Sequence, residues 1–133
     1  MKTILSLFSL LLLFSCATKQ SETQKADNTL YNTWQLTHLN NEKVSFTTTL
    51  IVTKANYSGH AACNNYGGSL SILKNTIVFG ATRATKMACS NLNKEQQYFN
   101  MLPKIHYYKI SNNILLFYDA KNKLLMTFTL SKI

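Results

Sequence analysis

Acidic residues are scarce in this chain, and their placement excludes one broad class of chemistry. Five carboxylate side chains stand against 14 lysines and arginines in 133 residues, which gives a net charge of +9. Two of the five, Glu22 and Asp27, fall in a polar N-terminal stretch outside the expected domain. The other three, Glu42, Glu95 and Asp119, are far apart along the chain. The sequence therefore offers no carboxylate pair suited to general acid–base catalysis.

Glycine and cysteine are also few, and neither occurs in a common cofactor motif. Gly67-Gly68 is not followed by Lys-Ser or Lys-Thr, so a phosphate-binding loop is absent. The three cysteines form no Cys-x-x-Cys redox motif. A nucleophilic Cys63 would need a base, and His60, three residues away, points to the opposite face of a strand. Four zinc ligands at suitable spacing are not evident either. We expect no catalytic residues, no metal ligands and no cofactor.

Long hydrophobic runs are missing apart from residues 4–14. This run is too short to span a bilayer comfortably but has the length of the apolar core of a signal peptide. It ends in Leu13-Phe14-Ser15-Cys16, which looks like a bacterial lipobox. The pattern predicts a lipoprotein signal peptide at 1–15 and a lipid anchor on Cys16. An ordinary secretory signal and an uncleaved anchor are the alternatives.

Residues 16–29 contain no aliphatic side chain larger than alanine and predict a disordered tether. Its typical reach is about 20 Å. Ala17 stands where an aspartate would resemble an inner-membrane retention signal, so we expect the outer membrane, with the domain facing the periplasm.

The basic charge suggests an anionic partner. Loss of Lys2 with the signal peptide leaves a net charge of +8. Nucleic acid is the usual partner at such a charge, but export argues against it. An anionic envelope surface fits the location better. The lysines form no run, so a soluble surface that is merely basic is the other interpretation.

Residues 30–133 are expected to form one domain of α+β class. Alternating apolar residues predict an antiparallel sheet of about 7–8 strands. Helical spacing predicts one short helix at about 93–102, which Pro103 ends. Residues 64–68 are expected to form a tight loop, and glycine at this density indicates either positive φ or a close approach of chain to chain. The expected strands are 34–38, 46–52, 57–61, 69–72, 76–79, 106–110, 114–118 and 124–130.

Such a curved sheet presents more apolar surface than one short helix can cover. Trp34 is more typical of a core side chain than of a ligand platform. The uncovered remainder either collapses into a dry core or stays open as an apolar cavity for a ligand. The candidate lining residues are Trp34, Leu36, Leu50, Val52, Phe99, Leu116, Phe128 and Leu130.

Two motifs occur in a specific order: Gly59-x-x-x-Cys63-Asn64-x-Tyr66-x-Gly68, then Thr85-x-Met87-x-Cys89. Trp34-x-Leu36, Glu95-x-x-x-Phe99-x-x-Leu102 and Tyr108-x-Ile110 accompany them. Together they resemble the META domain, the family of the heat-shock lipoprotein HslJ. The resemblance covers about Leu30 to Leu130. One departure is Ala62, where the family often has glycine.

The resemblance implies a small, partly open β-barrel closed by one helix. It also implies an envelope protein, often a lipoprotein, tied to stress and drug tolerance, and it brings no established catalytic residues. The family motif favours a Cys63–Cys89 disulfide. Export to an oxidising compartment favours it too, as does the pair of cysteines that remains once Cys16 is lipidated. Such a bridge would close a loop of about 26 residues and contribute about 3 kcal/mol. The expected role of the motif loop is structural in the first place, with ligand binding as the alternative. Its residues are Gly59, Asn64, Tyr66, Gly68, Thr85 and Met87.

We therefore expect a non-enzymatic envelope lipoprotein that binds a protein partner or an apolar small molecule in envelope stress or maintenance. Its contact with the membrane is through the lipid anchor, and nucleic acid is not an expected partner. The alternative is a thiol-redox or enzymatic periplasmic protein that uses Cys63 and Cys89.

Overall fold

The computed structural model describes residues 30–132. The predicted signal peptide at 1–15, the predicted tether at 16–29 and the predicted lipidation site Cys16 all lie outside the described residues. Within the described part, no helix is both long and apolar enough to cross a membrane.

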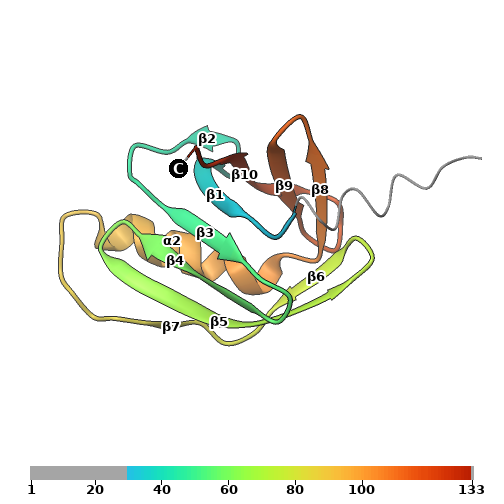
Figure 1. Ribbon diagram of the computed structural model, residues 1–133. Coiled ribbons are helices and arrows are strands. Elements are labelled where there is room, and N and C mark those ends of the chain that lie inside the picture. Colours follow the sequence, from blue (N-terminus) through green and yellow to red (C-terminus); the bar gives the residue numbers. More distant parts are fainter. Residues whose placement is uncertain (1–29, 133) are drawn as a thin grey trace, which may run out of the picture.

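The described residues include ten strands, the helix α2 and one 3-10 helix (Figure 1). The helix α2 is Leu92–Met101, and the 3-10 helix η1, Leu102–Lys104, follows it with Pro103 at its centre. The strands are β1 (Thr33–Leu39), β2 (Glu42–Lys43), β3 (Thr49–Val52), β4 (Asn56–Ala61), β5 (Asn64–Leu73), β6 (Thr76–Phe79), β7 (Arg83–Ala84), β8 (Tyr107–Ser111), β9 (Ile114–Tyr118) and β10 (Leu124–Leu130).

Eight of these strands form a closed antiparallel barrel, so the predicted α+β, barrel-like fold is confirmed. The order is β10-β9-β8-β6-β5-β4-β3-β1, and β1 also pairs with β10 from Trp34↔Leu130 to Leu39↔Met126. The ring is therefore closed where the expectation left it partly open, because β1 pairs with β3 along one edge and with β10 along the other. The narrowest junction lies between β6 and β8, which share the single pair Thr76↔Tyr107. The short strands β2 and β7 lie outside the ring.

The glycine-rich segment is not a loop, which corrects the expectation for residues 64–68. Asn64 to Gly68 belong to β5, and no described glycine has positive φ. The turn lies just before, where Ala61 pairs with Asn64 and Ala62 has φ 51°. Alanine thus adopts the left-handed conformation at the position where the family often has glycine. The reason for glycine in the strands is close approach, since a Cβ on Gly59 would lie 2.0 Å from the Thr49 carbonyl oxygen.

Two strand predictions also change. The second strand was expected from Phe46 but begins at Thr49, because the chain bends at residues 45–46 and Thr48 forms only an isolated bridge to Ala61. In β10 the register shifts between Leu124 and Met126. This bulge turns Leu125 inward beside Met126, so the expected strict alternation along the strand is broken there.

The core fills the barrel with large apolar side chains. Trp34 is fully buried and its Nε1 donates to the Leu30 carbonyl at 2.9 Å, so the single tryptophan is a core residue. Phe117 makes edge-to-face contacts with Phe79 and Phe128 at 5.6 Å. From α2, Tyr98 is fully buried, which closes the barrel on the helix side.

Candidate functional site

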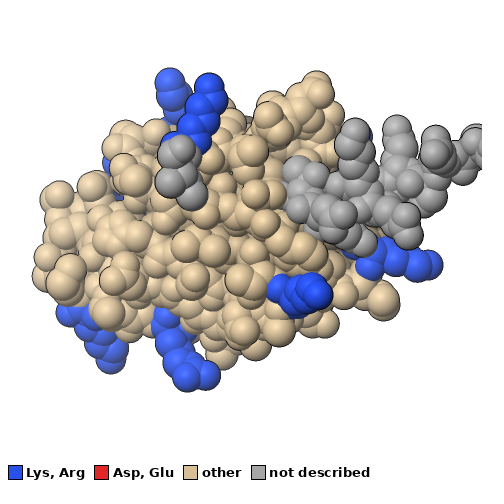
Figure 2. All heavy atoms as spheres, in the orientation of Figure 1, with Lys and Arg blue, Asp and Glu red and all other residues tan. Residues whose placement is uncertain are grey.

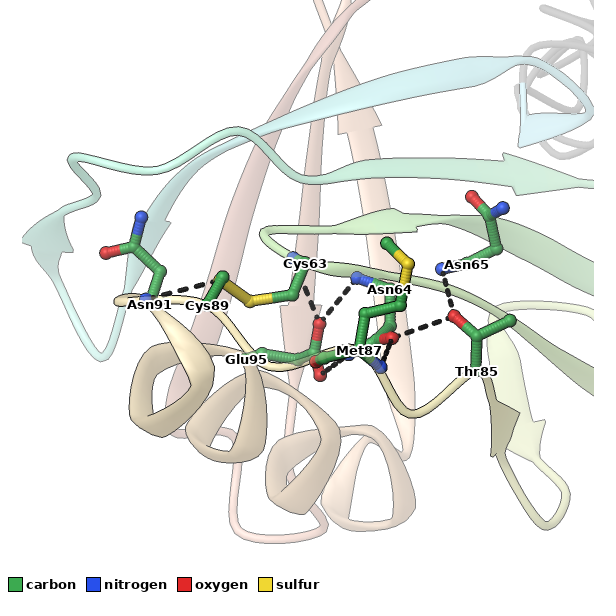
Figure 3. Close-up of a disulfide and its surroundings, with 8 residues drawn as sticks. All are labelled: Cys63, Asn64, Asn65, Thr85, Met87, Cys89, Asn91 and Glu95. Atoms are coloured by element: carbon green, nitrogen blue, oxygen red, sulfur yellow. Dashed lines mark hydrogen bonds between the residues drawn. A yellow bond between two sulfur atoms is a disulfide. The ribbon is translucent and has the colours of Figure 1, made fainter.

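The two sequence motifs meet at one end of the barrel. The β4–β5 turn carries Cys63, and the segment 85–89 leads from β7 to the start of α2 (Figure 3). A disulfide joins Cys63 to Cys89, with the two Cα atoms 5.9 Å apart. Cys63 is buried whereas Cys89 is exposed. The bridge ties the helix start to the sheet, so both motifs form one structural unit.

Asn64 holds the second motif through its side-chain amide. Its Oδ1 accepts from the Met87 N–H at 2.7 Å and from the Thr85 hydroxyl at 2.8 Å. Its Nδ2 donates to the Met87 carbonyl at 3.1 Å and to Glu95 Oε1 at 2.7 Å. All four hydrogen-bonding positions of the amide are therefore used, in a side chain that is 1% exposed. This network fixes the path of residues 85–87.

Glu95 is the buried charge of this site. It lies in the first turn of α2, is 4% exposed, and is bound by amide groups. Its Oε2 accepts from the backbone N–H groups of Cys63 at 3.2 Å and Asn64 at 2.9 Å. The carboxylate thus satisfies the two donors of the β4–β5 turn and one donor of the Asn64 amide. It stabilises the turn in which Ala62 has positive φ.

A tyrosine pair continues this polar cluster towards the core. Tyr66 Oη donates to the Thr49 carbonyl at 2.7 Å and lies 2.6 Å from Tyr98 Oη. The rings meet edge to face with centroids 5.5 Å apart. Burial raises the pKa of the Tyr66 phenol well above its ordinary value, and the adjacent Tyr98 raises it further. Burial also raises the pKa of Tyr98. Both hydroxyls are therefore neutral structural groups at physiological pH.

A groove of about 370 Å³ opens between the segment 84–88 and α2. Its apolar lining includes Met87, Leu92 and Phe99, while Asn64 and Glu95 supply buried polar groups. Met87 is 62% exposed and Leu92 is 44% exposed. These are large exposures for apolar side chains, and together they mark the groove as an apolar surface on a rigid frame.

The predicted cavity residues lie elsewhere, with one exception. Trp34, Leu36, Val52 and Phe128 are at most 2% exposed and pack in the core, which is the collapsed-core alternative of the sequence analysis. Leu50 is also buried, and Leu116 and Leu130 are half-buried. Only Phe99 among the predicted residues lines the groove.

The groups proposed for chemistry are engaged structurally. The two sulfurs are bonded to each other, and His60 Nδ1 lies 3.2 Å from Asn65 Oδ1. Among the described residues, no cluster of three or more potential metal-ligating side chains occurs. Gly59 and Gly68 lie within strands, and Thr85 donates its hydroxyl to Asn64.

Basic side chains are scattered over the face that Figure 2 shows, and no acidic side chain is visible there. This agrees with the scattered lysines of the sequence.

Sequence reasoning missed the role of Glu95. The signal was present, because Glu95 shares a helix face with Tyr98 and Leu102, at spacings of three and seven residues. Leu92, in the same helix, lines the groove.

Comparisons with known proteins agree on the fold. A protein from Burkholderia xenovorans, solved by NMR, has a TM-score of 0.63 at 21% identity, over 77% of this chain and 83% of its own. A second NMR structure has a TM-score of 0.61 at 20% identity, over 78% and 92% of the two chains. A crystal structure of a DUF4847 family protein from Bacteroides vulgatus has a TM-score of 0.61 at 12% identity, over 80% and 97%.

No curated protein is similar enough to this chain to count as a match. At the identities above, the solved structures show the fold alone. The META domain family matches residues 27–132, which is most of the chain. The chain therefore belongs to the META domain family.

Proposed function

We propose that this protein is a non-catalytic lipoprotein of the bacterial envelope that binds an apolar segment of a partner protein in the groove beside α2. Cys16 carries the lipid anchor, the outer membrane holds it, and the role belongs to envelope stress or maintenance. The single observation that carries the binding role is the groove itself, which exposes Met87 and Leu92 on a rigid frame.

The frame around the groove supports binding rather than catalysis. The Cys63–Cys89 disulfide ties up both sulfurs, and the Asn64 amide is fully hydrogen-bonded within the protein. Glu95 accepts three N–H donors. A base or nucleophile needs a free lone pair directed at a substrate, whereas these groups hold the groove wall in place. A preorganised wall lowers the entropy cost of binding.

The size and lining of the groove favour an apolar occupant. A volume of about 370 Å³ lies at the lower end of the range for small-ligand sites. It has room for a few apolar side chains of a peptide segment. Methionine adapts its shape to different apolar contacts, which suits Met87 at the mouth.

Groove-filling variants test the binding role. Ala88 lines the groove, so Ala88→Phe should occupy part of it, while Ala120→Phe adds the same ring at an exposed turn that does not line the groove. The dye ANS should bind the native protein saturably at one site, and Ala88→Phe should weaken this binding about tenfold or more. Equal ANS binding by wild type, Ala88→Phe and Ala120→Phe would contradict the groove as a ligand site.

Site-directed photo-crosslinking in cells identifies the occupant. A photoreactive amino acid at Met87 should give a discrete crosslinked protein that Ala88→Phe abolishes, whereas the same group at exposed Ile51 should not. Crosslinking to a small apolar molecule in place of a protein would replace the proposed partner. Titratable thiols in protein taken from the periplasm would instead support the thiol-redox alternative.

The anchor is tested separately. Cys16→Ser should move the protein from the membrane fraction to the soluble periplasm. A variant that stays membrane-bound at high salt would show that the anchor is something else.

A further inference from the structure

We propose that the end of the barrel at which the described chain begins is a membrane-contact surface for anionic lipid headgroups. We call this end the entry rim. Its contact residues are Leu73 with Lys54, Lys74 and Lys132. The inference rests on the proposed lipid anchor for its biological setting, and it adds which face of the domain meets the bilayer.

The topology places four features at the entry rim. Neighbouring strands of the ring run in opposite directions, so successive hairpin turns alternate between the two ends of the barrel. The start of β1 therefore shares an end with the β3–β4, β5–β6 and β8–β9 turns. Hydrogen bonds tie parts of the rim together: Val52 N–H donates to the Asn32 carbonyl at 3.0 Å, and Ser131 N–H donates to the Thr33 carbonyl at 2.9 Å.

The charge of the entry rim has one sign. Lys54 lies in the β3–β4 turn, Lys74 in the β5–β6 turn and Lys132 just beyond β10, and all three are exposed. The carboxylate side chains of residues 30–132 are Glu42, Glu95 and Asp119. Each lies at the opposite end, since Glu42 follows β1, Glu95 contacts the β4–β5 turn and Asp119 lies in the β9–β10 turn. Since no described carboxylate lies at the entry rim, its lysines can attract anions without repulsion from a nearby negative charge.

An exposed apolar side chain stands beside this charge. Leu73 ends β5, directly before Lys74, and its exposure of 73% is the highest among the large hydrophobic side chains of the described residues. Ile114 begins β9 at the same rim and is 39% exposed. A leucine next to a lysine can enter the interfacial region while the ammonium group stays among the headgroups.

The position of the chain start favours a bilayer, and not a protein, as the surface that contacts the entry rim. The predicted tether of residues 16–29 precedes the described chain at the entry rim, so an anchored Cys16 would hold this rim at a typical distance of about 20 Å from the lipid surface. Short tethering gives weak contacts a high effective concentration. The groove lies at the opposite end and would face away from the membrane, where a partner protein can reach it.

Vesicle binding tests the surface without the anchor. The mature chain from position 16, carrying Cys16→Ser, should bind vesicles of phosphatidylcholine mixed with phosphatidylglycerol more tightly than pure phosphatidylcholine vesicles. Each lysine near an anionic surface is worth about a fivefold gain in affinity. Lys54→Gln with Lys74→Gln should therefore weaken binding about 25-fold.

A matched pair at the opposite end is the control. Lys121→Gln with Lys123→Gln removes the same charge from the β9–β10 turn and should change binding less than twofold. Equal losses for the two pairs, or no preference for phosphatidylglycerol, would overturn the entry rim as the contact surface. Because Cys16 is absent from this assay, its result is independent of lipidation.

A fluorescent reporter gives a second readout. Leu73→Trp should shift its emission to the blue on phosphatidylglycerol vesicles, whereas Leu92→Trp, beside the groove, should not. The native Trp34 is fully buried and supplies a constant background. A blue shift at Leu92→Trp but not at Leu73→Trp would assign the membrane contact to the opposite end.

Discussion

Asn64 is a residue whose whole side-chain capacity is used inside the protein. It receives two hydrogen bonds and donates two, and one acceptor is the carboxylate of Glu95. If Asn64 Nδ2 were an acceptor in place of a donor, Glu95 Oε1 would lose a hydrogen bond. At the level of single residues, the stability of the site depends more on the placement of donors and acceptors than on side-chain shape.

The change Asn64→Asp tests this dependence. The new oxygen would face the Met87 carbonyl and Glu95 Oε1, so two acceptors would lose their donor and a second buried carboxylate would lie beside the first. We expect the free energy of unfolding at pH 7 to fall by about 3 kcal/mol, measured by urea denaturation with the disulfide intact.

The neighbouring Asn65→Asp is the control. Asn65 is exposed, so the same charge change there should cost less than about 0.5 kcal/mol. If Asn64→Asp were as stable as Asn65→Asp, the network around Asn64 would not be a structural support.

The β4–β5 hairpin is the element that carries the motif glycines. A Cβ on Gly68 would lie 2.6 Å from the Ala81 carbonyl oxygen and 2.7 Å from Tyr57 Oη. Glycine at this position lets the backbone at Ala81 and the buried ring of Tyr57 approach the strand closely.

Gly68→Val should therefore destabilise the protein by steric conflict. We expect the melting temperature to fall by several degrees, at about 4–8 °C per kcal/mol for a domain of this size. Ser69→Val, one position along β5 and exposed, is the control and should leave the melting temperature nearly unchanged. An unchanged melting temperature for Gly68→Val, together with lost function in cells, would assign this position to binding.

Helix α2 connects the groove to the core. Tyr98 is buried in the core, Leu92 and Phe99 line the groove, and the buried Glu95 lines the groove and binds the β4–β5 turn. The disulfide and the Glu95 hydrogen bonds hold the first turn of the helix against the β4–β5 turn. The groove wall is therefore as rigid as the barrel end on which it stands.

At the scale of the whole molecule, the buried tyrosines couple stability to alkaline pH. The pKa values of Tyr66 and Tyr98 are raised in the folded state, so the unfolded chain loses these protons first as the pH rises. Stability is thus retained below the ordinary tyrosine pKa of about 10 and falls above it.

Tyr98→Phe should reduce this alkaline loss. Between pH 10 and 12, the free energy of unfolding should fall less steeply in the variant, by up to about 1.4 kcal/mol per pH unit for the one tyrosine removed. At pH 7 the variant should be about 1 kcal/mol less stable because the bond to Tyr66 is lost. Chemical denaturation at several pH values measures both effects, and parallel curves for the two proteins would contradict the linkage.

The two ends of the barrel divide the proposed roles. The groove and the three described carboxylates lie at one end, and the chain start with three lysines lies at the other. Under the proposed membrane contact, this division would orient the domain on the bilayer, which a scattered charge pattern in the sequence does not reveal.

Local patterns in the sequence determined the class of fold and most of its elements. Trp34 and Leu36 alternate and are both buried, and Pro103 ends α2 within one residue of the expected position. The family motifs predicted the META domain, and the cysteine count, the expected export and those motifs together favoured the disulfide. These features follow from periodicity, from backbone restrictions at proline and from motif spacing, all of which act over short stretches of chain.

Only the tertiary structure decided the features that need distant segments to meet. Glycine in β5 was expected to form a turn, but Gly68 is there because Ala81 and Tyr57 approach the strand. Glu95 was not recognised as buried, since its donors come from residues about 30 positions away. The ring closes because the first and last strands pair, which neither strand's own residues specify. Pairing partners and close approaches depend on the packing of the whole chain, and local sequence carries no record of them.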